Sequence, residues 1–147
     1  MAWFYAALAF LAGLASPIQA GVNASLVRFA GHAIIAAFLS FAVGTLTLGL
    51  YMLATRTPLP SWAQLSQTPL LMLSGGVLGA YFVASIIFAA PKLGAAALIA
   101  FIIAGQMTGS ILLDHFGLLG FPEHPVNLWR LVGVACLIAG VVLIRTF

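Results

Sequence analysis

Residues 93–113 read LGAAALIAFIIAGQMTGSILL, a stretch without a single charged side chain. A helix needs about 20 mostly apolar residues to cross the hydrocarbon core of a bilayer, and this stretch meets that requirement. Four other stretches of the chain meet it as well. The five expected spans are residues 3–27, 33–54, 70–90, 93–113 and 129–146. Because barrel strands would alternate in polarity over about ten residues, these spans are predicted to be helices.

The composition of the 147 residues indicates the same class of protein. Hydrophobic residues make up 64% of the chain and charged residues 5%, whereas a soluble domain carries about 25% charged residues. This composition excludes a soluble enzyme, a nucleic-acid-binding protein and a disordered protein. Cys136 is the only cysteine, so neither an intrachain disulfide nor a cysteine metal cluster is possible. We expect an all-α integral membrane protein, with a single transmembrane domain over residues 1–147 and no cofactor.

Five spans would place the two ends of the chain on opposite sides of the membrane, and the Lys and Arg residues indicate which side is cytoplasmic. Arg56 and Arg130 lie on the side of the amino terminus, whereas Arg28, Lys92 and Arg145 lie on the other side. Applied literally, the rule puts the amino terminus outside. The difference is a single charge, so two interpretations stay open: a fixed orientation, or insertion in both orientations.

Polar side chains inside the spans are the candidate binding residues. An unpaired polar group in hydrocarbon is costly and turns toward other helices or a wet cavity. In the first span, Ser16, Gln19 and Asn23 are spaced so that all three lie on one helix face. Pro17 removes a backbone donor and frees a carbonyl beside them, so a kink is expected there.

The fourth span carries a second polar stripe. Gln106, Ser110 and Asp114 follow one another at intervals of four residues, and Gly105 thins the helix beside Gln106. A purely structural role is the alternative for both stripes. Hydrogen bonds between membrane helices contribute on average about 0.6 kcal/mol, and they bridge helices without any further function.

Glycines recur in the spans and are interpreted as helix-packing positions, because small residues let membrane helices approach closely. Two of them, Gly75 and Gly79, form a GxxxG step in the third span. The full set of expected packing positions is Gly13, Gly75, Gly79, Gly105, Gly133 and Gly140.

Asp114 and His115 stand next to each other at a helix end and suggest either an acid–base pair or a solvated helix cap. Adjacent residues point in different directions on a helix, which favours the cap. The sequence contains no HExxH, no GxSxG and no phosphate-binding loop. An enzyme is therefore not expected.

Several short motifs follow one another in a fixed order. Gly13, Pro17, Gln19 and Asn23 form the pattern G-x3-P-x-Q-x3-N in the first span. The later motifs are Gly75-Gly76-x2-Gly79-Ala80-Tyr81, Pro91-x2-Gly94-Ala95, Ala104-Gly105-Gln106, Asp114-His115-Phe116-Gly117 and Ala139-Gly140-Val141. Over nearly the whole chain this set resembles the YdcZ-like family of short bacterial membrane proteins, part of the drug/metabolite transporter superfamily. Larger members of that superfamily have ten helices in two inverted halves and move small organic solutes. The resemblance implies that this chain is one such half, and it carries over no catalytic residues.

The residues and the resemblance lead to one hypothesis: a transporter subunit of the bacterial inner membrane that works by alternating access. Two oppositely inserted copies, or one copy and an inverted paralogue, would rebuild the ten-helix fold with a substrate site near the membrane midplane. The expected site residues are Gln19, Asn23, Gln106, Tyr81, Ser16 and Ser110. Such side chains favour a neutral or weakly charged polar solute. A non-transporting scaffold or accessory subunit is the alternative. The expected partners are membrane lipid, the second subunit and the solute, but no nucleic acid.

Overall fold

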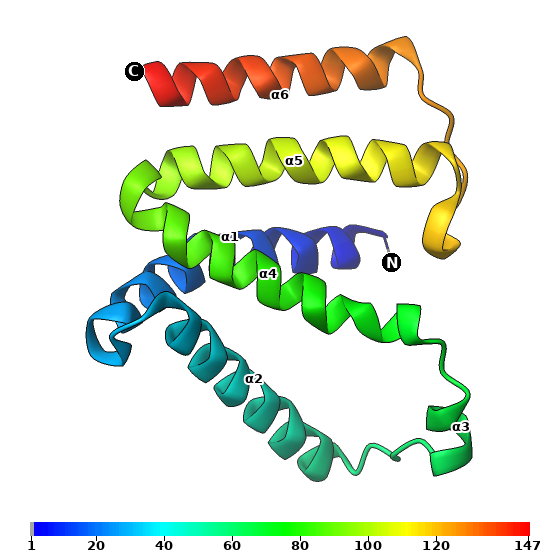
Figure 1. The fold of residues 1–147 in the computed structure, drawn as a ribbon. Coiled ribbons are helices and arrows are strands. Elements are labelled where there is room, and N and C mark those ends of the chain that lie inside the picture. The colour runs from blue at the N-terminus through cyan, green and yellow to red at the C-terminus, as the bar shows by residue number, and fades with distance from the viewer. Residues whose placement is uncertain (1) are drawn as a thin grey trace. The chain divides into compact units, whose positions relative to one another are not determined.

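The computed structural model describes residues 2–147, and five long helices dominate it (Figure 1). All five are long and apolar enough to cross a membrane, as the sequence predicts. They are α1 (Ala2–Ala30), α2 (Ala33–Thr55), α4 (Leu70–Leu93), α5 (Ala95–His115) and α6 (Leu128–Thr146). The helices form two compact units, a first unit that ends at Lys92 and a second unit, Leu93–Phe147.

A tight turn joins α1 to α2 in the first unit. Gly31 has a φ of 76°, a conformation that glycine adopts without a steric penalty. His32 then caps α2, because its Nδ1 accepts a hydrogen bond from the Ile34 N–H at 3.2 Å. The helix α1 extends to Ala30 rather than to the expected residue 27. Arg28 is well placed in its last turn, where a cation is favourable.

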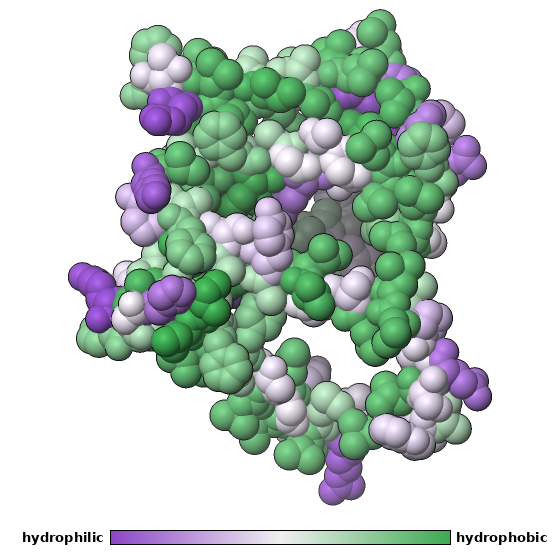
Figure 2. All heavy atoms as spheres, in the orientation of Figure 1, coloured by the Kyte–Doolittle hydropathy of each residue, from purple (hydrophilic) through white to green (hydrophobic). Residues whose placement is uncertain are grey.

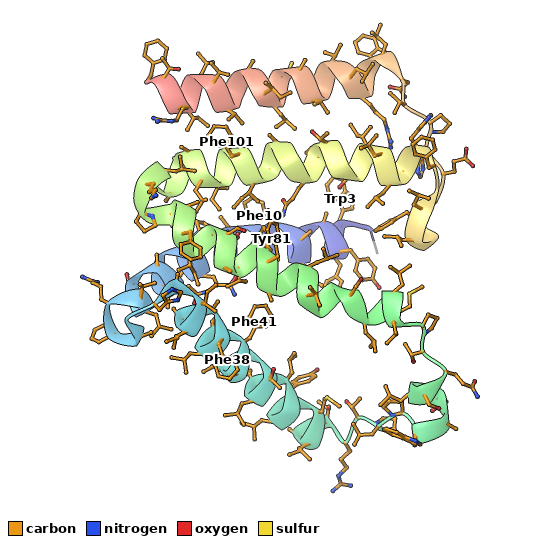
Figure 3. All side chains as sticks on the ribbon, in the orientation of Figure 1. Trp3, Phe10, Phe38, Phe41, Tyr81 and Phe101 are labelled. Atoms are coloured by element: carbon orange, nitrogen blue, oxygen red, sulfur yellow. The ribbon has the colours of Figure 1, made fainter. Side chains whose placement is uncertain are left out.

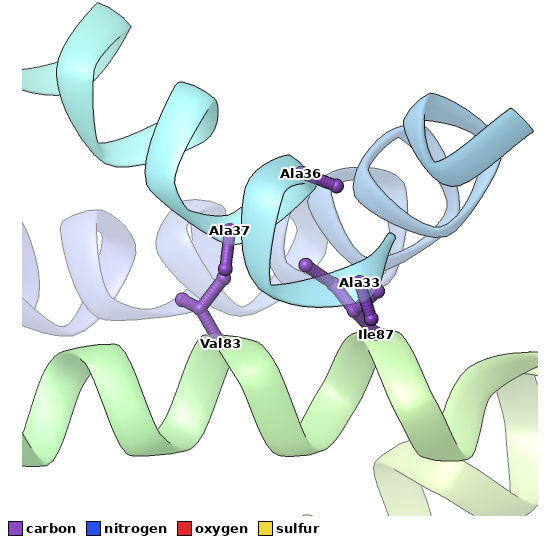
Figure 4. Packing of buried hydrophobic residues seen from close by; sticks show 5 residues of the cluster. All are labelled: Ala33, Ala36, Ala37, Val83 and Ile87. Carbon is purple, nitrogen blue, oxygen red and sulfur yellow. The ribbon is translucent and has the colours of Figure 1, made fainter. Parts of the chain in front are cut away.

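Side chains of α4 reach a cluster of small residues near the start of α2. Ala33, Ala36 and Ala37 are buried together with Val83 and Ile87 of α4 (Figure 4). The methyl groups of Ala33 and Ala37 leave room for the two larger side chains, while Ala36 points toward α1 (Figure 4). This cluster is the hydrophobic core of the first unit, and it fixes the end of α2 that lies next to α1.

The helix α4 continues past the end expected from the sequence. The sequence places that end at Ala90, before a turn at Pro91-Lys92, whereas α4 runs through Pro91 to Leu93. Proline lacks the N–H that would bond to the carbonyl four residues earlier, and α4 continues for only two residues beyond Pro91. The next residue that leaves the helix at low cost is Gly94, whose φ is 77°.

The connection between α2 and α4 contains a short helix that the sequence does not suggest, α3 (Trp62–Ser66). A capping box starts it: the Ser61 N–H donates to Gln64 Oε1 at 2.9 Å, and the Gln64 N–H donates to Ser61 Oγ at 3.3 Å. Trp62 is exposed, in keeping with the preference of indole rings for the membrane surface.

In the second unit, α5 and α6 lie side by side and are joined by a connection with one turn of 3-10 helix, Leu118–Gly120. Asn127 caps α6, because its Oδ1 accepts a hydrogen bond from the Arg130 N–H at 2.9 Å. Hydrophobic residues cover most of the face seen in Figure 2, as expected for helices that meet lipid.

Candidate functional site

A cavity of about 220 Å³ lies in the first unit between α1, α2 and α4. Gln19 contributes from α1 and Val83 from α4. The rest of the lining comes from one face of α2, namely Ser40, Phe41, Gly44, Thr45 and Leu48. The cavity therefore includes Gln19, which the sequence analysis selects as a site residue. It also includes residues of α2, a helix in which the sequence analysis selects no site residue.

Helical spacing explains why α2 supplies so much of the lining. Ser40, Gly44 and Leu48 follow at intervals of four residues and lie above one another on the helix. Gly44 borders open space, because a Cβ atom there would meet nothing within 4 Å. Phe41 points from α2 toward α4 (Figure 3), and its ring would lie 3.5 Å from a Cβ atom built on Gly79. The Phe41 ring thus lies beside Gly79 at a distance that would put a Cβ atom there in van der Waals contact.

The cavity lies near mid-depth of the helices that form it. Gly44 is the central residue of α2, and Val83 and Gln19 lie within one turn of the centres of α4 and α1. At 1.5 Å per residue, the centre of a membrane helix is about 15 Å from either edge of the hydrocarbon core.

The polar groups of the cavity are uncharged and have no partner among residues 2–147. The Gln19 amide and the hydroxyls of Ser40 and Thr45 make no hydrogen bond to any described residue. By contrast, the Thr47 hydroxyl donates to the Val43 carbonyl of its own helix at 2.8 Å. The groups at the cavity are thus available to a ligand.

Asn23 lies one turn after Gln19 on α1, and its environment is different. Its side chain is 5% exposed and is the buried polar side chain of the described chain, while Gln19 is exposed. Ser16 and Pro17 are half-buried, and α1 is one continuous helix through Pro17. Asn23 makes no side-chain hydrogen bond within the described residues, and it does not line the cavity.

The other predicted site residues are not brought into this cavity. Tyr81 on α4 is 74% exposed and lies outside the lining. Gln106 and Ser110 are exposed on α5 and belong to the second unit. A site shared by Gln19, Asn23 and Gln106 therefore stays a prediction.

Of the expected packing glycines, Gly79 faces a side chain, that of Phe41. A Cβ atom would meet nothing within 4 Å at the other five, Gly13, Gly75, Gly105, Gly133 and Gly140. Their role in packing against a partner helix stays a prediction.

Asp114 and His115 organise the loop between α5 and α6. Asp114 Oδ2 accepts a hydrogen bond from Arg130 Nη1 at 3.2 Å, and the Asp114 carbonyl accepts from the His124 N–H at 2.7 Å. His115 Nδ1 accepts from the Val126 N–H at 3.2 Å. The Asp114 side chain therefore binds Arg130 in the first turn of α6, and the His115 side chain binds the loop at Val126. Together they stabilise the connection between α5 and α6. The described residues contain no group of three or more His, Cys, Asp or Glu suited to a metal ion.

Sequence reasoning missed Ser40 and Thr45. Both are small and polar inside a largely apolar span; Ser40 lies one helical turn before Gly44, and Thr45 directly follows it. The signal was present, but it was weaker than that of an amide, because hydroxyls in membrane helices often bond only to their own backbone.

The comparison with known proteins agrees with the architecture. The family model described as "Putative inner membrane exporter, YdcZ" matches residues 4–143. No curated protein and no solved structure matches the chain. The family description and the five apolar helices identify a multi-pass protein of the inner membrane, a transporter rather than an enzyme. Because the match covers nearly the whole sequence, the chain belongs to the YdcZ family.

Proposed function

We propose that the protein is a subunit of an exporter for a small, neutral or weakly charged polar solute, moved by alternating access. The observation that carries this proposal is the cavity at mid-depth in the first unit, with three uncharged polar side chains that have no partner among residues 2–147. Gln19, Ser40 and Thr45 are its proposed solute-binding residues.

The lining supports an uncharged solute with hydroxyl or amide groups. The amide of Gln19 offers donors and an acceptor, and each hydroxyl offers one donor and two acceptor lone pairs. No Asp, Glu, Lys or Arg lines the cavity. A fully charged solute would lose its hydration at this depth without gaining a countercharge, which is costly in the membrane.

The size of the cavity supports a site completed by a second subunit. Its volume of about 220 Å³ lies below the 300–1,000 Å³ that is typical of small-molecule sites. Gln106, Ser110 and Tyr81 are exposed polar residues of membrane helices, and each would find partners at a subunit interface. We therefore propose an antiparallel homodimer, or a pair with an inverted paralogue, with the solute at the interface near the midplane. Such a dimer would have the ten helices of the larger drug/metabolite transporters.

A ligand screen tests the proposal. Purified protein is heated with a panel of neutral polar, anionic and cationic solutes, and a solute that binds the folded state raises the unfolding temperature. We expect a neutral solute to stabilise the wild type but not Gln19→Leu or Thr45→Val. The matched control is Thr47→Val, because the Thr47 hydroxyl bonds to its own helix.

Two outcomes would contradict the proposal. One is stabilisation by the same solute in both Gln19→Leu and Thr45→Val at the wild-type level. The other is that only charged solutes stabilise the wild type.

A further inference from the structure

A second groove lies on α2, between mid-depth and the end of the helix near Arg56, with a volume of about 710 Å³. Leu46, Leu50, Met52 and Leu53 line it from α2, and Leu59 lines it from the following connection. Thr45, Gly49, Arg56 and Thr57 complete the lining. The groove is therefore mainly apolar, and Arg56 lines it at the end of α2.

Arg56 forms no ion pair with any of residues 2–147. The sequence contains two acidic residues, Asp114 and Glu123, and both belong to the second unit. Asp114 is paired with Arg130. A cation at the end of a membrane helix without a protein countercharge is complementary to an anionic headgroup of the bilayer.

The backbone at Arg56 points to a role for the side chain. Arg56 ends α2 in the left-handed conformation, with a φ of 52° and a ψ of 37°. Glycine is the usual residue at such a helix end, and arginine is less favourable there because of its Cβ atom. Glycine would be favoured at this position if the residue only had to end the helix. Arg56 provides a guanidinium group there instead.

The length of the groove matches one leaflet. Thr45 follows the central residue of α2, and Arg56 is its C-cap. The rise over these 11 residues is about 16 Å, and half of a hydrocarbon core of about 30 Å is about 15 Å. An acyl chain in the groove would start at the membrane surface and end near the midplane.

We propose that this groove binds one anionic phospholipid of the surrounding bilayer. Arg56 holds the phosphate through charge-assisted hydrogen bonds, and the acyl chain lies over Gly49 along the leucine side chains. This lipid site is separate from the solute cavity, although Thr45 borders both.

Native mass spectrometry of the detergent-purified protein tests the site, with phosphatidylglycerol and phosphatidylcholine as probes. Removing the protein from the bilayer also removes any effect of its orientation. We expect the wild type to retain phosphatidylglycerol with about fivefold preference over phosphatidylcholine, because both lipids carry the phosphate but only phosphatidylglycerol offers Arg56 a headgroup with a net negative charge.

Two variants separate the headgroup from the groove. Arg56→Gly keeps a residue suited to the left-handed helix end and is expected to bind both lipids equally weakly. Gly49→Leu fills open space, since a Cβ atom there meets nothing within 4 Å, and is expected to lose both lipids. Arg28→Gln and Gly76→Leu are the matched controls, because neither residue lines the groove, and both should retain lipid as the wild type does.

Three results would overturn the proposal. The first is unchanged phosphatidylglycerol retention in both Arg56→Gly and Gly49→Leu. The second is an equal loss in Arg28→Gln, which would indicate diffuse attraction to any cation. The third is that Gly49→Leu dissociates a dimer while lipid retention stays unchanged, which would assign the groove to a second copy of the chain.

Discussion

Arg130 Nη1 donates a hydrogen bond to Asp114 Oδ2 at 3.2 Å, and this ion pair ties the first turn of α6 to the last turn of α5. The same nitrogen donates to the His124 carbonyl at 3.1 Å. The His124 N–H in turn donates to the Asp114 carbonyl at 2.7 Å. The ion pair, the bond from Arg130 to the His124 carbonyl and the backbone bond from His124 to Asp114 therefore hold both ends of the connection and its middle, so the two helices of the second unit are fixed at this end.

The first prediction is that Asp114→Asn lowers the free energy of unfolding by about 1 kcal/mol, the upper range for partly exposed ion pairs. Both side chains are 30% exposed, so solvent screens the pair. For a protein of this size the loss corresponds to a decrease of about 2–4 °C in unfolding temperature. Thermal unfolding in detergent measures it.

A double-mutant cycle identifies the ion pair as the cause. We expect Asp114→Asn/Arg130→Gln to be no less stable than either single variant, because each already removes the pair. Glu123→Gln is the control, since Glu123 forms no ion pair within residues 2–147. Simple addition of the two losses would show that the residues act independently.

The second prediction distinguishes the two glycines of the GxxxG step in α4. Gly79→Leu would force a side chain against the Phe41 ring, which lies 3.5 Å from the position of a Cβ atom. Overpacking of this kind costs about 1–3 kcal/mol. Gly75→Leu meets open space and should leave the unfolding temperature of the monomer unchanged. Equal losses in the two variants would contradict the packing described for α2 and α4.

The sequence predicts the long helices well and the connections poorly. An apolar stretch of about 20 residues has one stable form in lipid, so composition alone locates the five spans. Local details depend on single residues. Proline at position 91 suggests a helix end, but the end lies at Leu93 because the next residue is glycine. The short α3 depends on a capping box, Ser61 with Gln64, in a region that the prolines suggest is a loop.

The candidate site is predicted only in part. Gln19 is found because an amide in an apolar helix stands out, and Asn23 is found for the same reason. Helical spacing does not tell which neighbouring helix faces Gln19, so Ser40 and Thr45 are missed. Helical spacing also does not tell how deeply a side chain is buried. Asn23 and Gln19 share a helix face, but Asn23 is buried and Gln19 is exposed.

The third prediction concerns Asn23, which is 5% exposed and makes no side-chain hydrogen bond within the described residues. Asn23→Leu removes no hydrogen bond within the described residues, and the amide atoms of Asn23 are not buried without a partner, so the change should not lower the unfolding temperature. It should lower transport in proteoliposomes if the amide binds the solute. An unfolded or strongly destabilised Asn23→Leu protein would instead assign the amide to helix packing.

The fourth prediction concerns orientation in the membrane. With five spans, three Lys and Arg residues are expected on one side and two on the other, so a change of one or two charges is expected to decide the orientation. Adding two lysines after Phe147 should fix the carboxyl terminus in the cytoplasm, and replacing Lys92 and Arg145 with glutamine should favour the reverse. Reporter fusions at the carboxyl terminus measure the two populations. A carboxyl terminus that stays entirely cytoplasmic in every variant, in a protein that remains monomeric, would rule out an inverted pair.

The fifth prediction concerns Gln106, which lies next to Gly105, the central residue of α5. Gln106 therefore lies near the middle of its own helix, and its side chain is exposed within a single chain. An amide at mid-depth is stable in the membrane only if another helix or a solute provides a partner. A second subunit is the partner that we propose.

Replacing Gln106 with leucine should leave the fold intact, because an amide contact between membrane helices contributes only about 0.6 kcal/mol. It should abolish the stabilisation by solute, since a site built on hydrogen bonds loses most of its affinity with one partner. Thr108→Val is the control on the same helix, because the Thr108 hydroxyl donates to the Ala104 carbonyl at 2.8 Å. If Gln106→Leu binds solute as well as Thr108→Val does, Gln106 faces lipid or a closed helix contact, and the solute site is formed by the first unit alone.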